Sequence, residues 1–449
     1  MDSSQDLNDI DLTAPLTIDE ALQLATSLHR AGHHQDASEV YSRVLALVPD
    51  HPDALHFMGV LAHDQRRNED ALRLMARSVE LVPKHAPFRN NFGNLLLDNE
   101  RFEDAEREYR EALALDPDRP DALHNYAVLC KALRRYPEAE RSLLRAIELA
   151  PDFTEARNTL AGLYFRQGRI EEAVAQACEA LVREPSNAFT REMLGNAHCR
   201  LGHPEKAAQI YREWLAEEPD NPKALHHLAA CTGDAIPARA ADAYVQCIFD
   251  HFSKSFDSRL AALEYRAPAL VAQAVATCVG APAADRAVLD AGCGTGLCAA
   301  LLKPFAQTLT GVDLSEGMLG KARGRELYDD LQQAELCAYM QQHPGRYDII
   351  VSADTLVYFG VLDEAMAAAA RALRPNGCLC FTVEALEDGE TQPYRLQHHG
   401  RYAHSRDYLA TVLARLGLTV ERLEQVVLRR EAGLPVAGWL VLAQQPEHP

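Results

Sequence analysis

Apolar and small residues recur in the first half of the chain with a period of 34 residues. In six successive units an alanine is followed twelve residues later by a proline, at Ala37 and Pro49, Ala71 and Pro83, Ala105 and Pro117, Ala139 and Pro151, Ala173 and Pro185, and Ala207 and Pro219. The residues before each proline have helical spacing, and proline ends the helix because it pushes the preceding residue out of the α region. An earlier helix in each unit places a large apolar residue before an alanine or glycine, as at Phe92 and Gly93. The period predicts pairs of closely packed helices.

From Ala287 onward the pattern changes to short apolar strands that alternate with helices. The first strand ends at Asp290, and a glycine-rich turn and a helical pattern follow it. A second strand ends at Asp313, a weak third one comes next, and a fourth lies in the run RYDIIVSADTLVYF. The run ALRPNGCLCFTVEAL predicts a helix, a turn and a fifth strand, and residues 425–430 and 439–443 predict a closing hairpin. Strands that alternate with helices indicate a mainly parallel sheet.

The chain has 449 residues, a formal net charge of -20 and 47% hydrophobic residues, which suits a folded protein of two domains or one long solenoid. A nucleic acid partner is disfavoured, because a protein that grips a duplex needs clustered positive charge. Most of the negative charge, -14, precedes Pro237 and therefore belongs to the helical repeats. This excess of acidic residues favours basic or neutral peptide partners.

Residues 1–17 are acidic and polar, so we expect a disordered tail there rather than a secretory signal. No apolar stretch approaches the roughly 18 residues that a membrane span needs, and we therefore expect no membrane partner. The eleven cysteines form no CxxC pair and have no metal-ligand spacing. We expect reduced thiols, a cytoplasmic protein and no metal site.

The 34-residue period resembles that of the tetratricopeptide repeat family, whose helix-turn-helix units stack into a superhelix. The resemblance covers residues 18–221 as six repeats. Thr17 and Glu20 have the spacing of a capping box at the start of the first helix. We expect a degenerate seventh repeat over residues 222–250, whose second helix doubles as the first helix of the next domain. This junction is therefore expected to be rigid.

One position in the first helix of the repeats carries side chains that donate or accept hydrogen bonds. It is occupied by His56, Asn90, His124, Asn158 and His226, and Asn91 and Asn125 lie next to it. Equal positions of stacked repeats line up on one face, so two interpretations are open. The face is either a wetted concave surface or a ladder that pairs with the backbone of an extended peptide. The ladder would bind peptides with little sequence selectivity.

The glycine-rich turn DAGCGTG suits a nucleotide-like ligand, because glycines allow a tight turn whose backbone amides face the ligand. At the end of the next strand, Asp313 can accept hydrogen bonds from both hydroxyls of a ribose. A nicotinamide dinucleotide and S-adenosylmethionine both fit these features. The dinucleotide fingerprint, however, requires a glycine five residues after Gly292, where this chain has Leu297.

The run DAGCGTG and the strands around it resemble class I S-adenosylmethionine-dependent methyltransferases, over residues 251–449. The resemblance implies a Rossmann-like α/β domain with a mainly parallel seven-stranded sheet and an antiparallel last strand. The runs FDHFSKSFDSRLAALEYRAP, DTLVYFG and GRYAHSRDYL also resemble a bacterial branch in which this domain is fused to tetratricopeptide repeats. The expected fold class is therefore an all-α solenoid followed by an α/β methyltransferase domain.

The resemblance implies S-adenosylmethionine as cofactor and a set of residues around it. Asp290 and the backbone of Gly292, Gly294 and Gly296 would hold the methionine half, Asp313 the ribose, Leu314 and Met318 the adenine ring, and Ala353 and Asp354 the methionyl side. Glu335 would meet the adenine amine, and the same run also offers Asp329 and Asp330 for this role. Phe252, Phe256 and Tyr265 would be apolar cover. Arg266 would meet the cofactor carboxylate, and a surface ion pair is the alternative for it.

Methyl transfer is an in-line displacement, so the protein must align the acceptor, and no covalent intermediate is required. The candidate catalytic residues are Tyr358 after the fourth strand, Glu384 at the end of the fifth, and Arg401 and His404 in the loop before the last helix. His404 could take a proton from a hydroxyl or amine, and a structural histidine is the alternative. Arg401 would suit a carboxylate acceptor.

Three functions are consistent with this organisation. In the first, the repeats recruit a peptide or protein partner or substrate for an S-adenosylmethionine-dependent methyltransferase. In the second, the enzyme is a small-molecule O-methyltransferase, for example of a carboxylate, and the repeats serve only complex assembly. The third is a non-catalytic scaffold that senses the cofactor, and the intact DAGCGTG run argues against it. The oligomeric state does not follow from the sequence.

Overall fold

The computed structural model describes residues 16–253, 256–387, 389–431 and 434–447 of the chain. The expected tail lies almost entirely outside these residues, as does part of the turn between the strands of the closing hairpin. The described residues belong to two compact units, which we treat separately.

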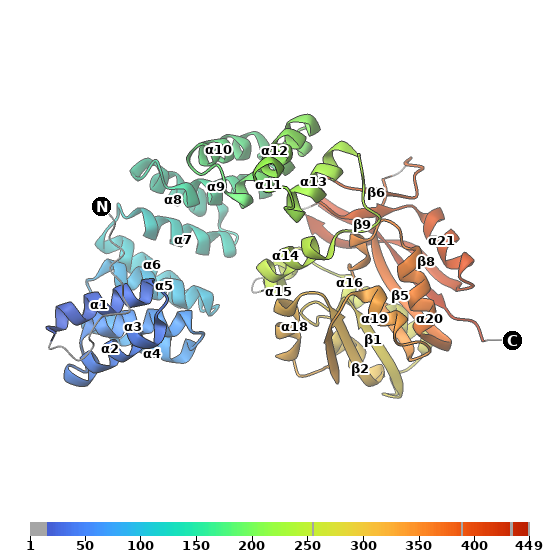
Figure 1. Ribbon diagram of the computed structural model, residues 1–449, viewed down its shortest axis with the longest axis horizontal. Coiled ribbons are helices and arrows are strands. Elements are labelled where there is room, and N and C mark those ends of the chain that lie inside the picture. Colours follow the sequence, from blue (N-terminus) through green and yellow to red (C-terminus); the bar gives the residue numbers. More distant parts are fainter. Residues whose placement is uncertain (1–15, 254–255, 388, 432–433, 448–449) are drawn as a thin grey trace. The chain divides into compact units, whose positions relative to one another are not determined.

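The first unit extends to residue 165 and includes residues 175–185. Consecutive helices pack against each other in pairs, as the 34-residue period predicts (Figure 1). The helices are α1 (Ile18–Arg30), α2 (His34–Leu47), α3 (Pro52–Asp64), α4 (Asn68–Leu81), α5 (Ala86–Asp98), α6 (Phe102–Leu115), α7 (Pro120–Ala132), α8 (Tyr136–Leu149), α9 (Thr154–Arg166) and α10 (Ile170–Arg183), the last of which belongs to both units.

The helix ends follow the sequence signals. The capping box at α1 is confirmed, because the Thr17 hydroxyl accepts a hydrogen bond from the Glu20 amide and the Glu20 carboxylate accepts one from the Thr17 amide, at 2.8 Å. At the other end of the helix pair, α2 stops at Leu47, two residues before Pro49. Proline thus separates successive units as expected.

The small residue in the first helix of each unit allows close helix packing. At Gly93 on α5, a Cβ atom would lie 2.7 Å from the ring of Tyr109 on α6. An alanine there would overlap the tyrosine, whereas Ala127 occupies the equivalent place in the next unit, where it is fully buried. The glycine therefore compensates for the large aromatic side chain that faces it.

The second unit begins with the last repeats and continues into the sheet. Helices α11 (Ala188–Arg200) and α12 (Pro204–Glu217) form one repeat, and α13 (Pro222–Thr232) and α14 (Asp242–Phe252) follow. Helix α13 ends at Gly233, whose positive φ of 72° suits a helix C-terminus. Two further helices, α15 (Phe256–Ala262) and α16 (Ala267–Val279), lead to the first strand.

The sheet has nine strands. They are β1 (Arg286–Ala291), β2 (Ala306–Asp313), β3 (Asp330–Gln333), β4 (Tyr347–Ser352), β5 (Leu373–Ala385), β6 (Tyr394–Leu396), β7 (Tyr402–His404), β8 (Thr419–Glu431) and β9 (Leu434–Gln444). Strands β3, β2, β1, β4 and β5 are parallel in this order, and β9 runs antiparallel to β5 and β8. The predicted α/β fold is confirmed. Two short strands, β6 and β7, occupy a segment for which the sequence predicts a loop, and β7 extends the sheet at the end of β5.

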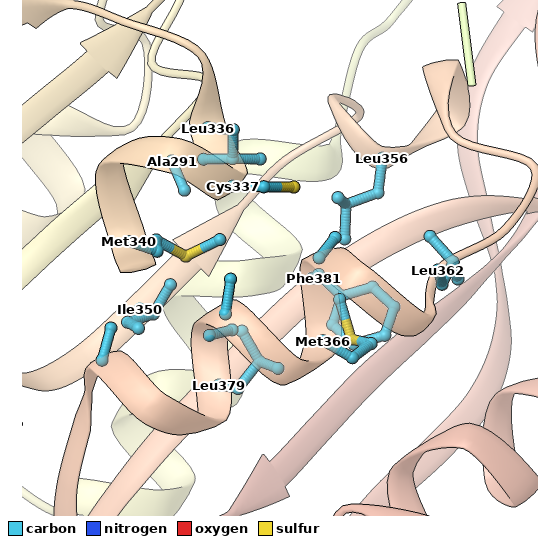
Figure 2. Close-up of a cluster of buried hydrophobic side chains, with 14 of the residues drawn as sticks. Ala291, Leu336, Cys337, Met340, Ile350, Leu356, Leu362, Met366, Leu379 and Phe381 are labelled. Carbon is cyan, nitrogen blue, oxygen red and sulfur yellow. The ribbon is translucent and has the colours of Figure 1, made fainter. Parts of the chain in front are cut away.

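Buried side chains alternate along the central strands because successive residues point to opposite faces of the sheet. On one face Ile350 and Leu379 pack with Met340 and Met366, which belong to α19 (Leu336–Gln341) and α20 (Asp363–Ala372) (Figure 2). The same face carries α21 (Arg406–Arg415). The opposite face packs against α16 and the short helix α17 (Ala299–Leu302). Helices on both faces leave the carboxyl edge of the parallel strands as the place where loops converge.

Candidate functional site

A cavity lies at the carboxyl ends of β1, β2 and β4, where the chain leaves the parallel sheet. The cavity has a volume of about 190 Å³. This edge is the common ligand site of open α/β sheets. The cavity brings together most of the predicted residues: Tyr265, Gly292, Gly294, Asp313, Leu314, Met318, Glu335, Ala353, Asp354, Tyr358 and Arg401.

The glycine loop after β1 has a backbone that other residues would not adopt easily. Gly292 has a φ of +79°, and a Cβ atom there would lie 2.2 Å from the hydroxyl of Thr355. Gly294, with a φ of +54°, faces open space instead, since the nearest atom to its Cβ position is 3.9 Å away in the Phe256 ring. The first glycine lets the loop approach the segment after β4, and the second leaves room for a ligand over the backbone.

Asp313 ends β2 and fastens the glycine loop. One carboxylate oxygen accepts a hydrogen bond from the Gly294 amide at 2.8 Å, and the other accepts one from the Ser315 amide at 2.9 Å. Burial raises the pKa of Asp313, and the two amides act in the opposite direction. Each carboxylate oxygen can accept a second hydrogen bond, so the group can still receive two donors from a ligand in the cavity.

Glu335 lies at the start of α19 (Leu336–Gln341) and also lines the cavity. One of its oxygens accepts a hydrogen bond from the Ala338 amide at 2.7 Å, whereas the other, Oε1, is buried without a partner among the described residues. Buried oxygens of this kind usually have a donor, so Oε1 marks a place for a donor from a ligand. With the space over Gly294 and the carboxylate of Asp313, it fits an adenosine group with its ribose hydroxyls and exocyclic amine.

Apolar side chains cover the cavity from the helices that precede the sheet. Phe249 on α14 and Phe256 on α15 line it, with ring centroids 5.9 Å apart, and Tyr265 lines it as well. The expected cover by Phe256 and Tyr265 agrees with this placement. Phe252 is absent from the lining and Phe249 takes its place, three residues earlier on the same helix. An aromatic cover excludes water from the cavity, which strengthens polar interactions inside it.

Five charged side chains contact one another beside the cavity, and three of them line it. We call them the ion cluster: Asp354 after β4, Glu384 on β5, Arg401 before β7, and Arg429 and Glu431 on β8. The Arg429 guanidinium contacts Asp354 and Glu431, each at 2.8 Å, and Glu384. Arg401 contacts Glu384 and Glu431, each at 2.6 Å.

Opposite charges outweigh burial for four members of the cluster, whereas burial raises the pKa of the fifth, Asp354, despite the nearby Arg429. Burial acts to lower the pKa of Arg429, but its three carboxylate neighbours, Asp354 first, leave that pKa raised. Burial acts to raise the pKa of Glu431, but Arg401 and Arg429 lower it to about 2. Next to the cluster, burial and the neighbouring Arg401 lower the pKa of His399 to about 4, so that imidazole is neutral. The cluster as a whole contains three carboxyl groups in contact with two guanidinium groups.

Arg429 is the residue of this site that the sequence analysis missed. It lies on the closing hairpin, far along the chain from the glycine loop, and it lines the cavity with 3% of its surface exposed. The structure also corrects the expectation for Arg401 as a ready partner for a carboxylate acceptor. Two of its nitrogens already contact Glu384 and Glu431. Glu384 itself lies behind the lining and holds both arginines.

The structure corrects the role considered for His404. This residue lies on β7, is completely buried, and its Nε2 is 3.1 Å from the carbonyl oxygen of Gly360. It does not line the cavity, and its ring stacks on that of Tyr408 instead. Burial lowers the pKa of His404 to about 4, although two carbonyl contacts act against this. His404 is therefore a buried structural histidine. Tyr358 does line the cavity, as expected.

Three predicted cofactor residues lie outside the lining. Asp290 is buried behind the glycine loop and accepts a hydrogen bond from the Tyr328 hydroxyl at 2.6 Å. Gly296 faces the Tyr328 ring, 3.0 Å from where its Cβ would be. Arg266 is exposed at the start of α16, and its amide donates a hydrogen bond to Leu428. The first two support the loop, whereas the exposed Arg266 does not line the cavity, although its neighbour Tyr265 does.

The polar positions of the repeats bind one another. In the first unit Asn91 contacts His56 at 3.1 Å, Asn125 donates to Asn90 at 3.0 Å, and His124 contacts Thr159 at 3.0 Å, each pair joining adjacent repeats. His56 and Asn90 are 1% and 2% exposed, and Asn158 is also buried. These contacts use part of the hydrogen-bonding capacity of the face, and Asn91, His124 and Asn125 are half-buried, so peptide binding by this face stays a prediction. The spacing of 35 residues lets one repeat satisfy the buried polar groups of the next.

In the second unit, His226 points to a different partner. Its Nε2 lies 2.9 Å from the carbonyl oxygen of Gly400, in the turn before β7. His226 is thus placed against the segment that carries Arg401 rather than along a repeat face.

None of the helices in the described part of the chain has the length and apolar character that a membrane crossing requires. Within the same residues, no group of three or more His, Cys, Asp and Glu side chains is arranged to hold a metal ion.

Comparison with known proteins relates both halves of the chain to families. The model of a methyltransferase domain matches residues 263–423. Models of the tetratricopeptide repeat match residues 22–86, 96–152, 131–189 and 190–231.

Curated relatives match part of the chain. It is 34% identical over 109 residues to a ubiquinone biosynthesis O-methyltransferase of Thiobacillus denitrificans, which covers 23% of this chain and 46% of the relative. It is 32% identical over 140 residues to methyltransferase-like protein 27 of Homo sapiens, which covers 30% of this chain and 56% of the relative. The chain thus spans about half the length of these relatives. Among solved structures, PilF of Pseudomonas aeruginosa is 17% identical with a TM-score of 0.43, covering 47% of this chain and 96% of PilF.

We predict that Asp290→Asn flattens the pH dependence of stability. Burial and then Asp313 raise the pKa of Asp290 to about 7, against an ordinary value of 3.8, and the Tyr328 hydrogen bond offsets part of this. Between these two values the unfolded chain releases a proton that the folded chain keeps, so this group costs stability as the pH rises. Asparagine mimics the protonated acid. The variant should therefore gain on the wild type, by up to about 4 kcal/mol in the free energy of unfolding, as the pH rises from 4 to 8.

Urea unfolding of both proteins at several pH values measures this difference, because all other titrating groups are shared. A constant difference between the two proteins from pH 4 to pH 8 would contradict the raised pKa.

Proposed function

We propose that this chain, in which tetratricopeptide repeats precede a methyltransferase domain, transfers a methyl group from S-adenosylmethionine to an acceptor beside the ion cluster. One observation carries the proposal. A single cavity is lined both by the glycine loop, Asp313 and Glu335 and by three members of the ion cluster, Asp354, Arg401 and Arg429. A site that only sensed the cofactor would have no use for a second, charged compartment in the same cavity.

The cofactor end of the cavity has residues suited to each part of the adenosyl group. The Asp313 carboxylate would accept hydrogen bonds from the ribose hydroxyls, and Glu335 Oε1 would accept one from the adenine amine. Leu314 and Met318 pack on the adenine ring, while the backbone over Gly294 supports the methionine half. When bound, S-adenosylmethionine supplies a methyl group on a positively charged sulfur, which needs no covalent help from the protein.

At the acceptor end, the protein aligns the incoming atom and excludes water. Both guanidinium groups of the ion cluster contact two or more carboxylates, so an acceptor carboxylate would have to compete with buried glutamates for them. This supports a neutral hydroxyl as acceptor, and the relative named as an O-methyltransferase supports oxygen as the acceptor atom. Asp354 lines the cavity and is the carboxylate we assign to accept a hydrogen bond from that hydroxyl, with Tyr358 beside it.

The repeats have two possible roles in this proposal. We favour recruitment of a peptide or protein, because the tetratricopeptide repeats, residues 18–236, carry a formal charge of about -10 that attracts basic partners. The alternative, a small-molecule O-methyltransferase whose repeats serve only assembly, draws support from the name of the Thiobacillus relative. The two roles differ in whether the methyl group is transferred to a macromolecule or to a small molecule.

We predict that Asp313→Asn weakens the binding of S-adenosylmethionine about 10- to 100-fold, because an amide cannot accept from both ribose hydroxyls and a hydrogen bond to a charged group contributes about 1.5–3 kcal/mol. Titration calorimetry measures the dissociation constant. Asp330→Asn, on the neighbouring strand β3 and outside the lining, is the matched control and should bind as the wild type does. Wild-type affinity in the Asp313 variant would remove the basis of the cofactor assignment.

We predict that methyl label from S-adenosylmethionine enters macromolecules when the protein is incubated with a heat-treated lysate of its own source. Heating inactivates other methyltransferases, and the Asp313→Asn variant, assayed at an S-adenosylmethionine concentration well below its weakened dissociation constant, serves as the low-activity control. After filtration, label retained with macromolecules supports recruitment by the repeats. Label found only in the filtrate would establish the small-molecule alternative, and no label above the control would contradict methyl transfer itself.

A further inference from the structure

The first helix of the seventh repeat, α13, contacts the turn that carries Arg401. His226 Nε2 lies 2.9 Å from the carbonyl oxygen of Gly400, and His227 Nδ1 lies 3.3 Å from that of His398. A carbonyl oxygen only accepts hydrogen bonds, so both imidazoles must donate. Two adjacent side chains of one repeat helix thus hold one short turn of the methyltransferase domain.

Both imidazoles are buried and neutral. His226 and His227 are 5% and 1% exposed, and burial is the main cause that lowers the pKa of each, to about 4 for His226. A neutral imidazole has a single N–H group, so each carbonyl contact also fixes the tautomer. The proton lies on Nε2 of His226 and on Nδ1 of His227. Neither ring can swing away without leaving a buried donor and a buried carbonyl unpaired.

The turn itself has little freedom. The Gly400 amide donates to the Gln397 carbonyl, and the Gln397 amide donates to the Arg401 carbonyl, both at 2.8 Å. Gly400 has a φ of +87°, and a Cβ atom there would lie 2.3 Å from the hydroxyl of Tyr244 on α14. The Tyr244 ring packs on His226, with centroids 3.9 Å apart. The turn is therefore closed by its own hydrogen bonds and clamped from outside by the two repeat helices.

We propose that His226 and His227 are positioning residues for the acceptor end of the cavity. They hold residues 397–401, and this turn places the Arg401 guanidinium against Glu384 and Glu431 in the ion cluster. The last repeat then helps to position a residue of the catalytic site. The inference rests on the proposed function for its catalytic consequence, but the mechanical link can be measured without any acceptor.

Hydrogen exchange of the backbone amides tests that link in the full-length protein. In His226→Ala the amides of Gln397 and Gly400 should exchange about tenfold faster or more, because the loss of a buried hydrogen bond costs about 1–3 kcal/mol. The amides of β1 and β4 should keep wild-type exchange rates. His226→Gln should restore slow exchange, since its side-chain amide can donate from the place of Nε2. His124→Ala changes the equivalent position of another repeat and is the control for exchange.

The catalytic consequence is read from the rate of label transfer into the heat-treated lysate. In His226→Ala the half-saturating amount of lysate should rise about tenfold, while the dissociation constant of S-adenosylmethionine stays within twofold of the wild-type value. His226→Gln should recover the wild-type rate. A purely structural role would instead lower the rate without this separation between acceptor and cofactor.

Two outcomes would overturn the proposal. Unchanged exchange at residues 397–401 would show that the histidines do not hold the turn, and faster exchange throughout the sheet would show a general loss of stability. If the wild type transfers no label, the proposed function fails, and the exchange data still decide whether the histidines position the turn.

Discussion

The ion cluster is the interaction on which the acceptor end of the cavity depends. It draws one or two residues each from the ends of β4, β5 and β8 and from the turn before β7, so four segments must reach their places together. Transfer of ions from water into a protein costs several kcal/mol per ion, and their attraction roughly repays it, so the cluster adds little net stability. Its effect is geometric. Loss of one partner leaves buried charges unpaired, which makes any other arrangement of the four segments costly.

The proposed cofactor site and the proposed acceptor site are built from different kinds of groups. At the cofactor end, backbone amides and the carboxylate of Asp313 form a rigid support, which suits a ligand that is the same in every reaction cycle. At the acceptor end, charged side chains from distant segments converge, and the position of Arg401 depends on a turn that the repeat helix α13 holds through His226. A helix of the last repeat therefore helps to hold a residue of the proposed acceptor site in place.

Local sequence signals predicted much of this arrangement. The 34-residue period, the capping box and the glycine loop with Asp313 each depend on neighbours within a few residues or one repeat. Arg429 could not be found in this way, because its role arises only when the antiparallel pair β8 and β9 brings the end of a hairpin beside β4 and β5. His404 misled for the opposite reason: a polar residue in an expected loop proved to lie on a short strand. The repeat ladder was seen, but pairing between neighbouring repeats uses part of its hydrogen-bonding capacity.

We propose that one cavity holds S-adenosylmethionine at Asp313 and Glu335 and directs its reactive sulfur toward the ion cluster. A crystal structure of the protein with S-adenosylhomocysteine tests it most directly. We expect the ribose hydroxyls within hydrogen-bonding distance of the Asp313 carboxylate, the adenine amine at Glu335 Oε1, and the sulfur facing the side of the cavity lined by Tyr358 and Arg401. A ligand bound elsewhere, or one whose sulfur faces away from the ion cluster, would contradict the account.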